Sequence, residues 1–386
     1  MAEPSRAARS SAATPTSTTS VLVTSMAVVV AALAVLLIAL AFGGGLTPSV
    51  LGDPGDLVRY GLPIARTVHD LSAALAVGAF VVAAVLLPHP SPAWTRAVRT
   101  AGIAGGVWAL AALLVLILTA MDVVGVAPGA PGFGAQFAQF AQEIDLGRAL
   151  LVTTVLAAVV ATIGAAVSTP VGAAWGAVMG VLALLPLSLS GHASGSSSHE
   201  TAVTSLAMHL VGVTIWVGGL ATVLVVAPLT RARAAGGERQ VDLTTLAGRY
   251  STLAGWSFAA VALSGVLNAW VRLGGWSGLD SDYGVLVIAK VVALLALGVL
   301  GGWHRRRTLP LLMSRPRSFL RIAAGELVLM GAAIGLGVAL SRSPTPVPDD
   351  SPTATAVETL LGQPAPPPLT VARWFTEVSP DLLWLV

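Results

Sequence analysis

The sequence predicts an all-α protein, a polytopic transmembrane helix bundle of about nine spans with its N-terminus in the cytoplasm. Hydrophobic residues make up 55% of the chain and charged residues only 10%, whereas soluble domains carry about 25% charged residues. The mean hydropathy is +0.84. The apolar residues gather in separate runs of roughly 20, the length at which a helix crosses the hydrocarbon core.

Nine apolar runs give the predicted spans. The first run is too long for the apolar core of a cleaved signal peptide, which has about 7–15 residues, so we expect it to be retained. Ser168, Thr169 and Pro170 leave a very short link between the fourth and fifth runs, which predicts a tight antiparallel hairpin. The predicted spans are 21–42, 65–88, 101–121, 147–168, 171–191, 201–227, 249–272, 284–303 and 319–341.

The distribution of basic residues sets the predicted orientation. With the N-terminus in the cytoplasm, the inner segments hold 14 of the 21 basic residues. They are Arg6, Arg9, Arg96, Arg99, Arg231, Arg233, Arg239, Arg249, Arg305, Arg306, Arg307, Arg315, Arg317 and Arg321. Because cytoplasmic loops of membrane proteins are enriched in Lys and Arg, this pattern explains the sequence pI near 9.9 without a nucleic-acid partner.

The composition divides the chain into five predicted regions. Residues 1–20 form a disordered cytoplasmic tail, 21–190 a first set of transmembrane helices, and 191–341 a second transmembrane domain. Residues 342–370 form an extracytoplasmic linker rich in Pro. Residues 371–386 begin another apolar run, which we interpret as the start of a truncated further membrane domain.

Histidines near the outer face are the candidate metal ligands. Three of the six, His192, His199 and His209, fall within 18 positions, and His69 lies near the outer end of the second span. His209 lies in the sixth span, ten residues beyond His199 and about 15 Å deeper at the helical rise. Since the chain has no cysteine, a soft-metal site would use these imidazoles, with Met121 as a thioether neighbour. Interfacial hydrogen bonding is an equally open explanation.

Other polar residues lie inside or beside the predicted spans. Lys290 and Glu326 each lie about two turns inside a span, so each should face the bundle interior and find its own polar partner. Lys290 and Glu326 could each fix the register of packed helices or take part in transport, and the sequence leaves both roles open. Asn268 is placed to hydrogen-bond across helices, and Gly218-Gly219 permits close helix approach. His89 and His304, beside Pro or Arg on the cytoplasmic side, are interpreted as ordinary interface residues.

Several short segments of the second half of the chain form a recognisable pattern. They are Ser190–Ala193, His209-Leu210, Ile215–Leu220, Arg249–Ser251, Ser264–Ala269 and Tyr283–Leu286. Together with Lys290 and the acidic Glu326, this pattern resembles the copper resistance protein D (CopD) family over about 190–340.

The first half resembles a longer, actinobacterial form of that family. Gly52–Gly55 and His69-Asp70 carry this likeness. In the longer form a CtaG-like cytochrome c oxidase assembly domain follows the CopD-like region. Residues 372–384 look like the entry to that domain, the rest of which is missing here.

The resemblance implies that copper ions are moved across, or delivered at, the cell (plasma) membrane. His192 and His209 occupy family motif positions, whereas His69 and His199 are added from their placement in the chain. A periplasmic copper chaperone or the oxidase assembly machinery would be the protein partner, in addition to copper and the lipid bilayer. Binding needs deprotonated imidazole, so copper affinity should fall below about pH 6.

Two other functions remain open from sequence. A haem-binding electron carrier of the cytochrome b561 type would use His69 and His209 as axial ligands. A non-catalytic scaffold for oxidase assembly would need no metal of its own. We see no hydrolytic constellation and do not expect an enzyme.

Overall fold

The computed structural model describes residues 16–47, 55–189, 199–230, 242–312 and 314–346, and these residues form helices with no strand among them. Nine candidate membrane spans occur within this described part, as predicted. The helices are α1 (Thr16–Phe42), α2 (Asp56–Val81) with the π-helical turn η1 (Val82–Leu86), α3 (Pro92–Val124), α4 (Phe133–Glu143), α5 (Asp145–Ala166), α6 (Pro170–Leu189), α7 (His199–Val213), the π-helical turn η2 (Thr214–Gly218), α8 (Gly219–Val226), η3 (Ala227–Leu229), α9 (Leu243–Leu273), η4 (Trp276–Asp280), α10 (Asp282–Trp303), the π-helical turn η5 (His304–Thr308) and α11 (Pro316–Leu340).

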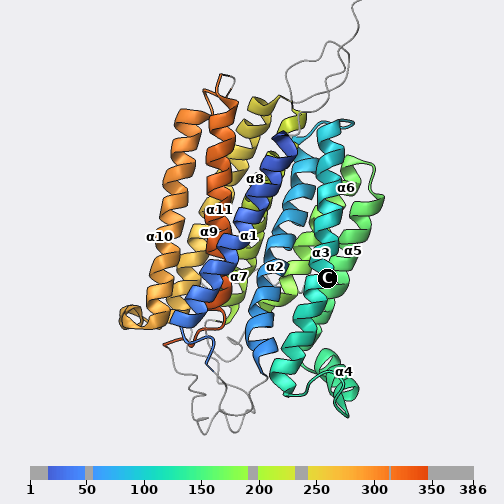
Figure 1. The fold of residues 1–386 in the computed structure, drawn as a ribbon, viewed down its shortest axis with the longest axis vertical. Helices are drawn as coiled ribbons and strands as arrows, with labels where there is room; N and C mark the ends of the chain where they lie inside the picture. Colours follow the sequence, from blue (N-terminus) through green and yellow to red (C-terminus); the bar gives the residue numbers. More distant parts are fainter. Residues whose placement is uncertain (1–15, 48–54, 190–198, 231–241, 313, 347–386) are drawn as a thin grey trace, which may run out of the picture.

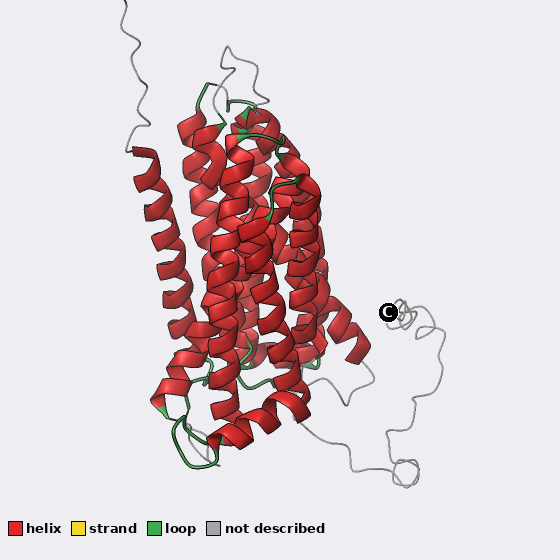
Figure 2. Ribbon diagram, turned by 90° about the vertical axis from the view of Figure 1, so that its right-hand side faces the viewer, coloured by secondary structure: helices red, strands yellow, loops and turns green. Residues whose placement is uncertain are grey.

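The long helices stand side by side in an elongated bundle (Figures 1 and 2). We call the end at which α1 begins the upper end and the end at which α4 lies the lower end, as drawn in Figure 1. The chain alternates between the two, so α2 rises to the upper end and α3 returns. The upper end is the one predicted to face the cytoplasm.

Close backbone contacts join helices that are far apart in sequence. Helix α1 packs on α11, the last helix of the described part, much more extensively than on its neighbour α2. A Cβ built on Gly335 would stand 2.0 Å from the carbonyl oxygen of Ala32. Small residues allow such close approach because helices in lipid associate by van der Waals packing.

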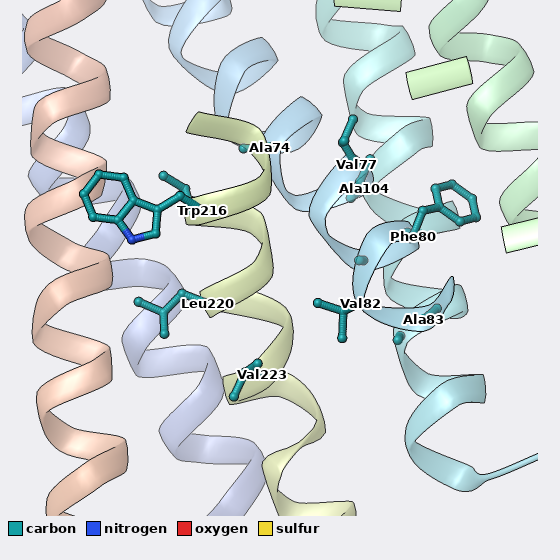
Figure 3. Close-up of a cluster of buried hydrophobic side chains, with 14 of the residues drawn as sticks. Ala74, Val77, Phe80, Val82, Ala83, Ala104, Trp216, Leu220 and Val223 are labelled. Carbon is teal, nitrogen blue, oxygen red and sulfur yellow. The ribbon is translucent and has the colours of Figure 1, made fainter. Parts of the chain in front are cut away.

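The central core lies between α2, α3 and the segment formed by η2 and α8. Figure 3 shows Trp216, Leu220 and Val223 along that segment, which lies beside α2. Phe80 of α2 extends to the other side, where a Cβ on Gly176 of α6 would meet its ring at 2.6 Å. Large apolar side chains elsewhere point outward, as expected of a lipid-facing surface: Ile38, Ile103, Leu110, Val299 and Trp256 are examples.

Several observed helices are longer than the predicted spans. Helix α1 begins at Thr16, inside the predicted tail 1–20, and α3 and α9 begin at Pro92 and Leu243 rather than 101 and 249. Helix α2 starts at Asp56 rather than 65, because Asp56, Arg59 and Arg66 interrupt the apolar run but are tolerated in the helix. Arg59 donates a hydrogen bond to Asp56 at 2.6 Å, three residues away. Arg66 also lies inside α2.

Helix α4 was not predicted. Its signal is a helical spacing of Phe133, Phe137 and Phe140, and the ring of Phe140 is fully buried. The helix is too short to span a membrane, and it lies at the lower end (Figure 1). An amphipathic helix in that position suits the membrane–water interface.

Candidate polar site within the helix bundle

A ladder of hydrogen bonds joins α7 to α9 in the lower half of the bundle. Ser205 and His209 lie one turn apart on α7, facing Ser264 and Asn268, one turn apart on α9. His209 Nδ1 lies 3.1 Å from Ser264 Oγ, and Asn268 Nδ2 donates to Ser205 Oγ at 3.4 Å. Arg272 Nε donates to Asn268 Oδ1 at 3.1 Å. We refer to these five side chains as the polar ladder.

The hydroxyl of Ser264 fixes the tautomer of His209. Ser264 Oγ lies 2.6 Å from the carbonyl oxygen of Ala260 and 3.1 Å from that of Val261. When its one proton goes to the shorter of these contacts, it accepts from His209, so Nδ1 carries the proton and Nε2 keeps a lone pair. This is the form in which imidazole binds a metal ion. The ring also has a hydrogen bond with the backbone of Val261.

Lys290 of α10 lies close to the polar ladder. Its Nζ is 3.3 Å from the position that a Cβ on Gly337 of α11 would occupy. The ammonium lies within electrostatic range of His209, and Arg272 and Asp70 lie within range of Lys290. None of the described residues forms an ion pair or hydrogen bond with Lys290. The partner expected for this residue is therefore not found in the described part of the chain.

His69 is held at both ring nitrogens. Nδ1 lies 2.9 Å from Asp70 Oδ1, and Nε2 accepts a hydrogen bond from Trp108 Nε1 at 2.9 Å. The imidazole is 3% exposed. To bind a metal, His69 would first have to release Trp108, so it offers no free nitrogen in this arrangement.

Glu326 has a partner that the sequence did not reveal. His304 Nδ1 lies 3.1 Å from Glu326 Oε1, and both side chains are buried. The interpretation of His304 as an ordinary interface residue is therefore wrong. The sequence hid this pair because 22 positions separate the two residues, and only the packing of α10 on α11 brings them together.

Of the remaining candidate ligands, only the side chain of Met121 lies within the described part of the chain. His192 lies outside the described residues, and His199 is the first residue of α7, with no described side chain. Met121 is 5% exposed and packs in a cluster of apolar side chains of α2, α3, α4 and α5. Its neighbour Asp122 accepts a hydrogen bond from Arg342 at 3.1 Å. Within the described residues, no three His, Cys, Asp or Glu side chains form a metal-binding group.

The Trp-Val-Gly-Gly segment after His209 has a structural role. Tyr250 Oη donates to the carbonyl oxygen of Trp216 at 2.6 Å, within the π-helical turn η2. Gly218 lies against α2, where an added Cβ would stand 1.7 Å from the carbonyl oxygen of Ala74. Gly219 makes room for the ring of Tyr250. This segment therefore packs α7 and α8 against α2 and α9, as the two glycines suggested.

The long apolar helices and the polar pairs between them define the class of protein to which this chain belongs. The chain is a multi-pass membrane protein whose polar side chains pair with one another between helices, while apolar side chains face outward. Residues 56–202 match the family model described as the copper resistance protein D-like N-terminal domain, and residues 244–340 match copper resistance protein D. The chain belongs to the copper resistance protein D family.

The matched segments cover most of the polar residues described above. His69, His192 and His199 lie in the first segment, and Asn268, Lys290 and Glu326 lie in the second. His209 and the Trp-Val-Gly-Gly segment lie between the two. No curated protein and no solved structure matches the chain.

Proposed function

We propose that this protein binds copper ions through His209 and moves or delivers them at the plasma membrane, without acting as an enzyme. Membership of the copper resistance family supports the choice of ion. The observation that carries the proposed site is the lone pair on His209 Nε2, which follows from the hydrogen bonds of Ser264. Copper is the cargo in this proposal.

The proposed route begins at the lower end, which we place outside the cytoplasm. His199 begins α7 at that end and His192 precedes it in the sequence, so in this proposal their imidazoles capture copper before it reaches His209. Borderline and soft metal ions accept imidazole readily, and the absence of cysteine leaves His and Met as the soft ligands. Met121 and His69 would have to leave their present contacts to take part.

Lys290 would limit how tightly the ion is held. A copper ion on His209 would be repelled by the nearby ammonium, since both are positive and the surroundings have a low dielectric constant. A transport site benefits from such a limit because the ion must leave again. A periplasmic chaperone or the oxidase assembly machinery would be the donor or acceptor at the membrane surface.

The test is metal analysis with a visible spectrum on purified protein. We expect wild-type protein to bind about one copper ion per chain through its imidazoles, and His209→Ala to lose most of it. His89→Ala is the matched control, because His89 contacts Trp94 near the upper end, far from the polar ladder. Copper binding that is equal in all three proteins would refute the role of His209. A haem Soret band would instead assign the chain to electron transfer.

A further inference from the structure

The pair formed by His304 and Glu326 is a second polar feature, separate from the polar ladder. His304 begins the π-helical turn η5, one turn before the upper end of its span, and Glu326 lies on α11. Their side chains are 9% and 8% exposed. The ring of Phe319 lies over the imidazole, with ring centroids 4.4 Å apart.

One nitrogen of His304 has no partner. A carboxylate only accepts hydrogen bonds, so Nδ1 is the donor to Glu326 Oε1 at 3.1 Å. Nε2 is buried, points away from the carboxylate and has no hydrogen-bond partner. A buried polar atom without a partner is costly, and such atoms in a native fold call for an explanation.

The charge of Glu326 is also unbalanced in the described part of the chain. The nearby basic residues Arg249, Arg305, Arg306, Arg307, Arg317 and Arg321 are all exposed, on α9, η5 and α11. Tyr250 of α9 lies within electrostatic range of Glu326, but it donates its hydroxyl proton to the carbonyl oxygen of Trp216. No described cationic side chain forms an ion pair with this carboxylate other than His304 itself.

The number of protons on the pair decides its charge. With one proton, on Nδ1, the pair carries a net charge of −1, which is unfavourable inside a bilayer. A second proton on Nε2 makes the pair neutral overall. A copper ion arriving near the pair would neutralise it in the same way.

We propose that His304 and Glu326 form a proton-binding site that exchanges its proton for the transported cation. A hydronium ion at the upper end gives its proton to His304 Nε2 and leaves water, and the Nδ1–H bond breaks as that proton moves to Glu326 Oε1. One O–H bond of hydronium and one N–H bond are broken, and one N–H bond and one O–H bond are formed, with no change of oxidation state. The exchange with copper rests on the proposed function, whereas the proton site itself does not.

Proton binding can be tested without copper. Infrared difference spectra of the purified protein in lipid, recorded as the pH is lowered, should show the band of a protonated carboxylic acid. The band should disappear in Glu326→Gln and shift in His304→Gln, since both glutamines can keep a hydrogen bond within the pair. Glu143→Gln is the matched control, because Glu143 is exposed on α4. Because the other Asp and Glu residues contribute the same bands to every variant, spectra of the wild type and of Glu326→Gln that show identical carboxylic acid bands would overturn the site.

Exchange can be tested in sealed vesicles that contain a pH-sensitive dye. Addition of Cu(I) to vesicles with wild-type protein should move about one proton for each ion, in the opposite direction. The reason is that the single negative charge of the pair is balanced by one proton or by one Cu(I) ion, but not by both. In Glu326→Gln and His304→Gln the proton signal should be lost. Copper movement without any proton signal in the wild type would overturn the exchange but leave the proposed function standing. No copper movement at all would overturn the proposed function, and the infrared result would then stand alone.

Discussion

Three described histidines share one arrangement at Nδ1 and differ at Nε2. Nδ1 is held by Asp70 in His69, by Ser264 in His209 and by Glu326 in His304. Nε2 accepts from Trp108 in His69, keeps a lone pair in His209 when Nδ1 carries the proton, and has no hydrogen-bond partner in His304. The partner of Nε2 therefore separates a histidine with a structural role from those available to a ligand or a proton.

Removing the indole donor should destabilise the protein. Trp108→Phe keeps most of the packing of a fully buried side chain but leaves His69 Nε2 without its hydrogen bond. We expect a loss of about 1–3 kcal/mol in the free energy of unfolding. Thermal unfolding in detergent measures it, with Trp256→Phe as the control, since Trp256 is 75% exposed. Equal melting of the two variants would contradict the structural role of His69.

Ser264 should control the copper affinity of His209 without binding copper itself. In Ser264→Ala the Nδ1 proton of His209 loses its acceptor, and the tautomer is no longer fixed. Loss of such a supporting hydrogen bond typically weakens metal binding by about 10–100-fold. A competition titration with a Cu(I) chelator measures the affinity, and Ser251→Ala, on the same helix, is the control. An unchanged affinity would mean that His209 does not bind through Nε2.

At the scale of elements, two helices meet by backbone contact. The π-helical turn η2 sets its Gly218 against Ala74 and Gly78 of α2, with no room for a side chain on either side. The sequence indicated close approach at Gly218-Gly219, but it did not identify α2 as the partner. That pairing joins the first segment matched by a family model to the stretch between the two matched segments.

Gly218→Ala should separate these helices. The added Cβ would meet the Ala74 carbonyl oxygen at 1.7 Å, and neither backbone can yield as a flexible side chain would. We expect a destabilisation of at least about 3 kcal/mol. Gly106→Ala is the control, because nothing lies within 4 Å of a Cβ there. Folded yield and melting temperature in detergent compare the two, and normal stability of Gly218→Ala would contradict the contact.

At the scale of the whole molecule, charge distinguishes the two ends of the bundle. The arginines of η5 and of the first turns of α3 and α11 lie at the upper end, together with Arg249 near the start of α9. The lower end carries helix α4 and acidic residues in the first turns of two helices, Asp56 in α2 and Asp145 in α5. This asymmetry is the basis for placing the upper end in the cytoplasm.

The absence of cysteine makes this orientation testable. Single cysteines at Arg307 and Gln142 would report on the upper and lower ends in intact cells, with the cysteine-free chain as the background. A membrane-impermeant thiol reagent should label Gln142→Cys from outside and leave Arg307→Cys unlabelled until the cells are opened. The reverse pattern would show that the upper end faces outward, and the proposed route for copper would then run in the opposite sense.

The sequence by itself determined the class of fold, the number of spans and the family. Those conclusions depend on apolar run lengths and local motifs, which are properties of consecutive residues. It missed α4, because three phenylalanines at helical spacing are a weak signal in a chain this apolar. Only the tertiary structure decided that Trp108 binds His69, that Ser264 orients His209 and that His304 is the partner of Glu326. Each of these pairs joins different helices, and the depth and rotation of packed helices are set by side-chain fit between them, which no local pattern in the sequence records.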